Sequence, residues 1–251
     1  MKRKERRHLK ESDLAQTILA AREAIDQRRG LLTGILLAVL LGAVVIGGIV
    51  VWQQEDDARA EQMLADAMVT FNARVIPPST TPAQPGEVPA AATLGATGSY
   101  ATEAAKLNAA APKLKAVADA YPGTDAGITA RYHYASSLAA LGKHAEAIQA
   151  FDDVINRAGG DSLYGRMAQM GKADTQTRAG QLNDAIAAWK SLAASSDEDL
   201  PKDAILMELG KAYQASGNQE EARKAFTQIV DEHPTSPYSA EARAELGTQG
   251  S

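Results

Sequence analysis

The chain shows three successive patterns of hydrophobic and polar positions. Residues 31–52 form an uninterrupted apolar run, residues 53–75 place apolar side chains at helical spacing, and the chain from Tyr100 onward repeats one helical pattern. Between the second and third patterns, residues 76–99 hold five of the ten prolines. The sequence therefore predicts an all-α protein in which a long apolar helix precedes a proline-rich segment and a helical array.

The apolar run predicts one transmembrane helix over residues 30–52. Its 22 uncharged residues, 31–52, make a helix about 33 Å long, enough to cross a bilayer core of about 30 Å. Nine Lys and Arg residues precede the run, whereas Glu55, Asp56 and Asp57 follow it. Because Lys/Arg-rich flanks stay in the cytoplasm, we expect a basic cytoplasmic tail over residues 1–29 and a single-pass topology.

Three alternatives stay open for this run. Ala58-Arg59-Ala60 has the small-x-small form of a cleavage site, and Arg28-Arg29 resembles part of a twin-arginine signal. Against cleavage, the run exceeds the roughly 7–15 apolar residues of a signal peptide, and acidic residues separate it from the site. Against a buried core helix, the run is apolar all round. We therefore favour a retained anchor.

Small residues recur at every fourth position of the run. They are Gly34, Ala38 and Gly42. This spacing is typical of faces through which membrane helices pair, so it predicts a helix-pairing face and a homo-oligomer. Gly and Ala are also common in membrane helices that do not pair, and this alternative stays open.

Two segments connect the run to the array. Leu64, Met68, Phe71 and Val75 fall at helical spacing, so we expect residues 53–75 to form a stalk helix or a helix that packs on the domain. The prolines of residues 76–99 deny backbone hydrogen bonds and favour extended chain. We expect a linker or long loop there, with a ligand for a proline-binding domain as the alternative.

The rest of the chain contains an internal repeat. Four positions recur with spacings of 7, 5 and 4 residues and a period of 37–38 residues. The three copies are Ala135, Gly142, Ala147, Phe151; Ala173, Gly180, Ala185, Trp189; and Gly210, Gly217, Ala222, Phe226. The repeats start near 128, 166 and 203 and extend over 128–165, 166–202 and 203–236. Such a period is the signature of stacked helix pairs.

Each recurring position has a physical role. A small residue in the first helix lets the second helix approach at its own small residue. The glycine suits the left-handed conformation that ends the first helix. The aromatic residue fills the gap toward the next repeat. We also expect a lead-in helix over 102–121, kinked or divided by Pro112, and an end-cap helix over 237–247 that starts at Ser236-Pro237.

These residues resemble the tetratricopeptide repeat, a helix-pair module of 34 residues. The sequence departs from the family pattern because it lacks the early tryptophan, and because the first two copies lack the closing proline that Pro234 supplies in the third. The resemblance implies an all-α helix-pair solenoid of about three repeats within residues 100–251, with flanking helices. The apolar run adds one N-terminal transmembrane helix to this fold class.

Composition and charge exclude most chemistry. The chain has no cysteine, which excludes disulfides, thiolate metal sites and a lipidated cysteine. The four histidines have no metal-ligand spacing, and no motif nominates a nucleophile or a phosphate loop, so we expect no enzyme, metal or cofactor. Residues 53–251 carry 17 basic and 26 acidic residues, a net charge of −9, which argues against nucleic acid.

What remains is a surface for proteins. By resemblance, the first helices line a groove through Thr129, Tyr132 and Ser136 in the first repeat. The further groove residues implied are Met167, Met170, Asp174, Arg178, Met207, Lys211 and Gln214. Methionine and tyrosine suit varied apolar peptides. The alternative is that the methionines pack between helices. The Lys and Asn set that clamps peptide carboxylates in some family members is absent.

The layout as a whole resembles the YfgM family of bacterial inner-membrane tetratricopeptide proteins. The resemblance implies a non-catalytic scaffold or chaperone-like adaptor with a cytoplasmic N-terminus and a periplasmic domain near the Sec translocon. Implied partners are translocon subunits, exported chains or periplasmic chaperones. Two alternatives stay open: an envelope or cell-division scaffold of the Tol–Pal-associated type, and a membrane-tethered oligomer that pairs through its span and stalk.

Overall fold

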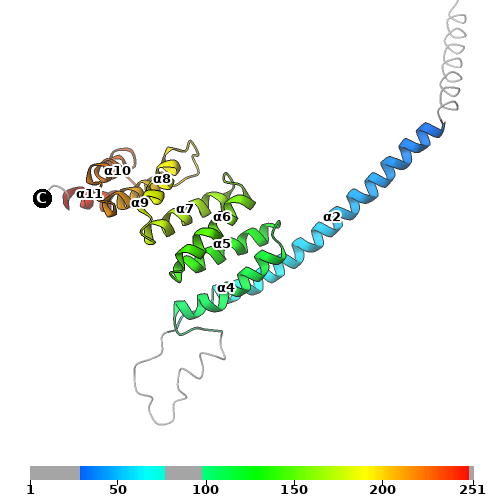
Figure 1. Cartoon of the computed structure of the whole chain (residues 1–251), viewed down its shortest axis with the longest axis horizontal. Helices are drawn as coiled ribbons and strands as arrows, with labels where there is room; N and C mark the ends of the chain where they lie inside the picture. The colour runs from blue at the N-terminus through cyan, green and yellow to red at the C-terminus, as the bar shows by residue number, and fades with distance from the viewer. Residues whose placement is uncertain (1–28, 77–97, 249–251) are drawn as a thin grey trace, which may run out of the picture. The chain divides into compact units, whose positions relative to one another are not determined.

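The computed structural model of the chain describes residues 29–76 and 98–248 (Figure 1). Nearly all of the predicted basic tail and most of the predicted linker lie outside the described residues. The chain divides into two compact units, Met1–Glu55 and Asp56–Ser251, and each is considered by itself.

A single long helix, α2 (Arg29–Phe71), contains the apolar run and most of the predicted stalk. Within the first unit, the large apolar side chains that the structure describes, from Leu37 to Trp52, are between 54% and 71% exposed. None of the helices, as far as their residues are described, combines the length and the hydropathy of a membrane span.

The second unit contains a solenoid of helix pairs, as the sequence predicts. Helix α4 (Glu103–Ala120) precedes three pairs, and α11 (Ser239–Thr248) closes the array. The pairs are α5 (Asp125–Ala140) with α6 (His144–Ala158), α7 (Leu163–Arg178) with α8 (Leu182–Ala194), and α9 (Lys202–Ala215) with α10 (Gln219–Glu232). In Figure 1 they stack in chain order from green to red. The described residues contain no strand, only an isolated bridge between Val75 and Tyr100.

Each pair turns at the glycine that the repeat predicts. Gly142, Gly180 and Gly217 have φ values of +75°, +75° and +80°, a region that other residues seldom adopt. The residue after each glycine donates its N–H to a carbonyl five residues back. These bonds are Lys143 to Leu138, Gln181 to Gln176 and Asn218 to Tyr213, each 2.9 Å long. This hydrogen-bond pattern, the Schellman motif, satisfies carbonyls that the helix end leaves free.

The pairs begin slightly before the repeat starts read from the sequence. α5, α7 and α9 start at Asp125, Leu163 and Lys202. Side-chain caps fix two of these starts, because Thr124 Oγ1 accepts from Gly127 N and Ser162 Oγ accepts from Gly165 N, each at 3.0 Å.

The aromatic positions pack where a glycine leaves room. A Cβ on Gly210 would lie 2.4 Å from the Phe226 ring of the same repeat. A Cβ on Gly171 would lie 2.6 Å from the Phe151 ring of the preceding repeat. Phe151 therefore fills the gap toward the next repeat as expected, whereas Phe226 packs inside its own.

Residues 56–71 of α2 pack on α4. Ala60 and Ala67 are buried, and Lys113 Nζ donates to Thr70 Oγ1 at 2.8 Å. Helix α4 also carries repeat spacing. Ala110, Leu114 and Pro122 match the spacing of Ala222, Phe226 and Pro234. The predicted lead-in helix therefore resembles the second helix of a further pair, whose first helix is the end of α2.

Two details of the flanking helices differ from prediction. Of the two predicted effects of Pro112, a kink or a division, the division does not occur, since α4 continues through this residue. Both Pro112 and Asn108 are exposed, so water can satisfy the Asn108 carbonyl that loses its helical donor. Helix α11 begins at Ser239 rather than Pro237. Ser236 instead accepts from Tyr238 N and donates to the Asp203 carboxylate at 2.6 Å, which lowers the pKa of Asp203.

We predict that Gly210→Ala destabilises the array by about 1–3 kcal/mol, because the added methyl overlaps the Phe226 ring. Gly247→Ala is the matched control, since an added Cβ there meets nothing within 4 Å. Urea unfolding of the full chain in detergent measures both variants. Equal stability of the two would contradict the packing described.

We predict that Ala67→Glu destabilises the second unit by about 3 kcal/mol, because it places a carboxylate in a site only 2% exposed. Val69→Glu is the control two residues away, at 73% exposure. Thermal unfolding followed by circular dichroism compares them. If Ala67→Glu behaves like Val69→Glu, residues 56–71 are not part of the array.

Candidate protein-binding surfaces

The array has two faces of different character. The first helices touch across repeats, because α5 contacts α7 and α7 contacts α9, whereas the described second helices of neighbouring repeats make no comparable contact. We call the surface of α5, α7 and α9 the inner face, and the surface of α4, α6, α8 and α10 the outer face. The inner face is therefore closely packed, and the outer face has room for grooves between helices.

Most predicted groove residues lie partly exposed on the first helices. Tyr132, Met167, Met170 and Asp174 are half-buried, and Arg178 is exposed. Asp174 and Arg178 pair with each other at 3.1 Å, one turn apart on α7. Met170 also packs against the core, which agrees in part with the alternative of methionine packing between helices.

The prediction for Met207 was wrong. Its side chain is 0% exposed and belongs to a core cluster with Leu206, Phe226 and Ile229. Lys211 and Gln214 are tied to α11: Lys211 Nζ lies 3.1 Å from Glu241 Oε1, and Gln214 Nε2 donates to Glu245 Oε2 at 2.7 Å. Residues of the closing helix thus bind these two side chains of α9. The open part of the inner face therefore lies on α5 and α7.

An aromatic row crosses this open part. The rings of Phe71 and His133 are 4.9 Å apart, those of His133 and Tyr132 are 5.5 Å apart, and those of Tyr132 and Tyr164 are 5.7 Å apart. The row joins the end of α2 to α5 and α7. Sequence analysis identified only Tyr132 as a binding residue, and the rings of Phe71 and Tyr164 come from helices whose packing on α5 is not local.

His133 is the ring of this row that can take up a positive charge. Its burial lowers its pKa below the ordinary imidazole value of 6.5. The imidazole is therefore neutral at pH 7, and the row presents apolar and aromatic surface without positive charge.

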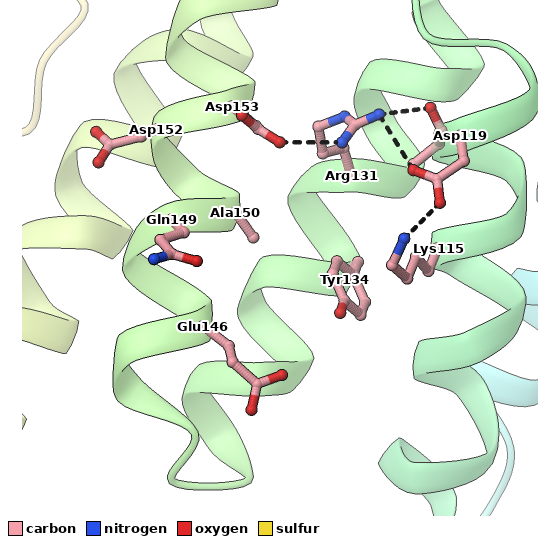
Figure 2. Close-up of a pocket in the computed structure, with 10 residues that line it drawn as sticks. Lys115, Asp119, Arg131, Tyr134, Glu146, Gln149, Ala150, Asp152 and Asp153 are labelled. Atoms are coloured by element: carbon pink, nitrogen blue, oxygen red, sulfur yellow. Dashed lines mark hydrogen bonds and ion pairs between the residues drawn. The ribbon is translucent and has the colours of Figure 1, made fainter.

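The outer face carries a pocket of about 550 Å³, which we call the Arg131 pocket (Figure 2). It is lined by Lys115, Ala118 and Asp119 of α4, Arg131 and Tyr134 of α5, and Glu146, Gln149, Ala150, Asp152 and Asp153 of α6. The sequence analysis did not identify any of these residues as a binding residue. They come from three helices, and only the stacking of the helices brings them together.

Arg131 holds the walls of this pocket together. Its side chain is nearly buried, yet Nη2 donates to the Ala118 carbonyl at 2.6 Å and lies 3.7 Å from Asp119 Oδ1. Nη1 donates to Asp153 Oδ2 at 3.3 Å. Lys115 bonds the other oxygen of Asp119, and this hydrogen bond raises the pKa of Lys115. One guanidinium therefore connects α4, α5 and α6.

A second pocket of about 500 Å³ lies on the outer face between α6 and α8. Its lining includes Gln169, Lys172, Asp184 and Ser191. These residues stand 38 positions after Arg131, Tyr134, Glu146 and Asp153, so the same groove recurs in the next repeat. Among the described residues, no group of His, Cys, Asp or Glu side chains is arranged to hold a metal ion.

Comparisons with known proteins identify the repeats. Two family models described as tetratricopeptide repeat match residues 204–236 and 96–162. The second match includes α4, in agreement with its place in a helix pair. Tetratricopeptide repeats are therefore present in this chain, and such repeats generally bind proteins and are not catalytic. No curated protein matches the chain.

One solved structure that the comparison matches to this chain is a set of nearly identical TPR-like repeats assigned to a kinesin light chain of Podosopora anserina. The two chains are 19% identical and align with a TM-score of 0.49, over 57% of this chain and 76% of the other.

We predict that acidification through pH 6.5 destabilises the array through His133. The unfolded state binds a proton near the ordinary pKa of 6.5, whereas the buried imidazole does not, so this contribution to stability is full above that pH and falls below it. His133→Phe keeps a ring beside Phe71 and removes the titration. The melting temperature should fall less between about pH 7.5 and about pH 5.5 in the variant. An equal fall in both proteins would contradict the prediction.

Proposed function

We propose that the protein is a non-catalytic, membrane-anchored scaffold or chaperone-like adaptor. Its repeats bind other proteins on the periplasmic side of a bacterial inner membrane, near the Sec translocon, as the resemblance to the YfgM family implies. The observation that carries the proposal is the open inner face of α5 and α7, where aromatic and methionine side chains remain half-exposed beside the Asp174–Arg178 pair.

Membrane anchoring is supported by the surface of α2. Eight large apolar side chains between Leu37 and Trp52 are each more than half exposed. So many exposed large apolar side chains have a high free energy in water, and a bilayer would remove them from water. The nine basic residues before it favour a cytoplasmic N-terminus.

The inner face suits apolar segments of partner proteins. Tyr132, Met167 and Met170 offer flexible or aromatic contacts that adapt to varied side chains. The neutral His133 extends this surface toward Phe71. Exported chains and periplasmic chaperones present such segments, so they are the partners we propose, together with translocon subunits.

The stripe of Gly34, Ala38 and Gly42 favours a second candidate, a membrane-tethered homo-oligomer. A Cβ added at Gly34 or Gly42 would meet nothing within 4 Å, and Ala38 is exposed. The stripe therefore leaves room for a close helix–helix approach. An envelope or division scaffold of the Tol–Pal-associated type differs from the main proposal in its partners.

We predict that translocon subunits or exported chains co-purify with the full-length protein from its own membranes in mild detergent. Met167→Glu should reduce the exported chains recovered by about tenfold, because it places a charge on the open inner face. Mass spectrometry of the purified complexes measures both quantities.

Lys190→Glu is the control, since Lys190 is exposed on α8 of the outer face. If only copies of the protein itself are recovered, the homo-oligomer replaces the scaffold near the translocon as the proposed function. Recovery of division or envelope components would favour the Tol–Pal-type scaffold. Equal losses in Met167→Glu and Lys190→Glu would exclude the inner face as the binding surface.

A further inference from the structure

The two outer-face grooves have the same framework and different charge. Four carboxylates and two cations line the Arg131 pocket, which gives it a net charge of −2. The groove one repeat later has Lys172 and Asp184 and is neutral. Stacking of helix pairs accounts for the grooves, but it does not account for the carboxylates in one of them. The negative charge of the Arg131 pocket therefore comes from its particular side chains and not from the fold.

The carboxylates of the pocket are not equally engaged. Arg131 and Lys115 hold Asp119, Arg131 holds Asp153, and Lys172 bonds Asp152 Oδ1 at 2.6 Å. Glu146 makes no ion pair within the described part of the chain. Figure 2 shows Glu146 and Gln149 away from the Arg131 ion pairs and Tyr134 beside Lys115, with no dashed line to Glu146, Gln149 or Tyr134. A cation placed at Glu146 gains a carboxylate without displacing an existing ion-pair partner, and the Tyr134 ring lines the same pocket.

A second observation also points to a ligand. Arg131 is 8% exposed, and its Nε has no hydrogen-bond partner among the described residues. A buried N–H without an acceptor is unfavourable by about 1–3 kcal/mol. This N–H is itself shielded from solvent, so a carbonyl oxygen of a peptide in the pocket reaches it only with a shift of the Arg131 side chain.

We propose that the Arg131 pocket binds a Lys- or Arg-bearing segment of a partner protein. The cationic side chain lies between Glu146 and Tyr134, and a backbone carbonyl of the segment faces the Arg131 guanidinium. A volume of about 550 Å³ accommodates one long side chain with its adjoining backbone. The negative charge of residues 53–251 also accelerates the approach of a basic partner. This site is distinct from the inner face, and the inference goes beyond the function proposed above.

The matched residue in the next groove gives the experiment its control. Glu146 of α6 and Asp184 of α8 occupy the same position of the repeat, 38 residues apart. Both are exposed, both line a pocket, and both lie in the first turn of their helix. Charge reversal at either residue removes the same favourable interaction with the helix dipole. A difference in binding between the two variants therefore reports the difference between the Arg131 pocket and the second pocket.

The test is the binding of a fluorescent Lys/Ala peptide with blocked, uncharged termini to the full-length protein in detergent. Fluorescence anisotropy measures the binding, and a Glu/Ala peptide is the negative control. We expect saturable binding that weakens about tenfold in Glu146→Lys and less than about twofold in Asp184→Lys. Met167→Glu should leave the affinity unchanged, which separates this site from the inner face.

Three results would overturn the proposal. Equal losses in Glu146→Lys and Asp184→Lys would mean that the peptide responds to diffuse negative charge. Loss of binding in Met167→Glu would place the peptide on the inner face. Absence of saturable binding to the wild-type protein would leave no cation site at all. Circular dichroism melts of the variants establish that each is folded, and Glu146→Gln, which adds no charge, should weaken binding by a smaller factor in the same direction.

Discussion

The array depends on the close approach of neighbouring helices at small residues. The Phe226 ring occupies the space that any side chain at position 210 would need, and the Phe151 ring does the same at position 171. Each large ring is fully or almost fully buried because the facing helix has no Cβ at the point of contact. Protein interiors tolerate few voids and little overlap, so these contacts fix both the separation and the order of the helices.

The two faces follow from this packing. First helices that touch across repeats leave less room on their side, and second helices that stand apart leave grooves between them. The fold thus produces an inner face of half-buried side chains and a series of outer grooves. It determines neither the charge of a groove nor the open length of the inner face. The charge of a groove depends on which residues the individual repeats carry at equivalent positions. The open length of the inner face depends on the closing helix α11.

Seven of the ten groove residues predicted from the sequence lie at least partly exposed on α5 and α7. Sequence reasoning failed at Met207, which is core, and it did not foresee that α11 engages Lys211 and Gln214. Helical spacing shows which residues share a face, but it does not show what covers that face. The Arg131 pocket was missed because its ion pairs join residues 12 and 22 positions apart in three different helices.

The sequence by itself determined the repeat, its period, the glycine turns and the all-α class, because these depend on interactions within one helix pair. It also identified an apolar segment whose described large side chains prove to be exposed on α2. Only the tertiary structure paired the end of α2 with α4, buried Met207 and assembled the Arg131 pocket. Each of these depends on contacts between segments that the chain separates, and the intervening residues carry no local signal of such contacts.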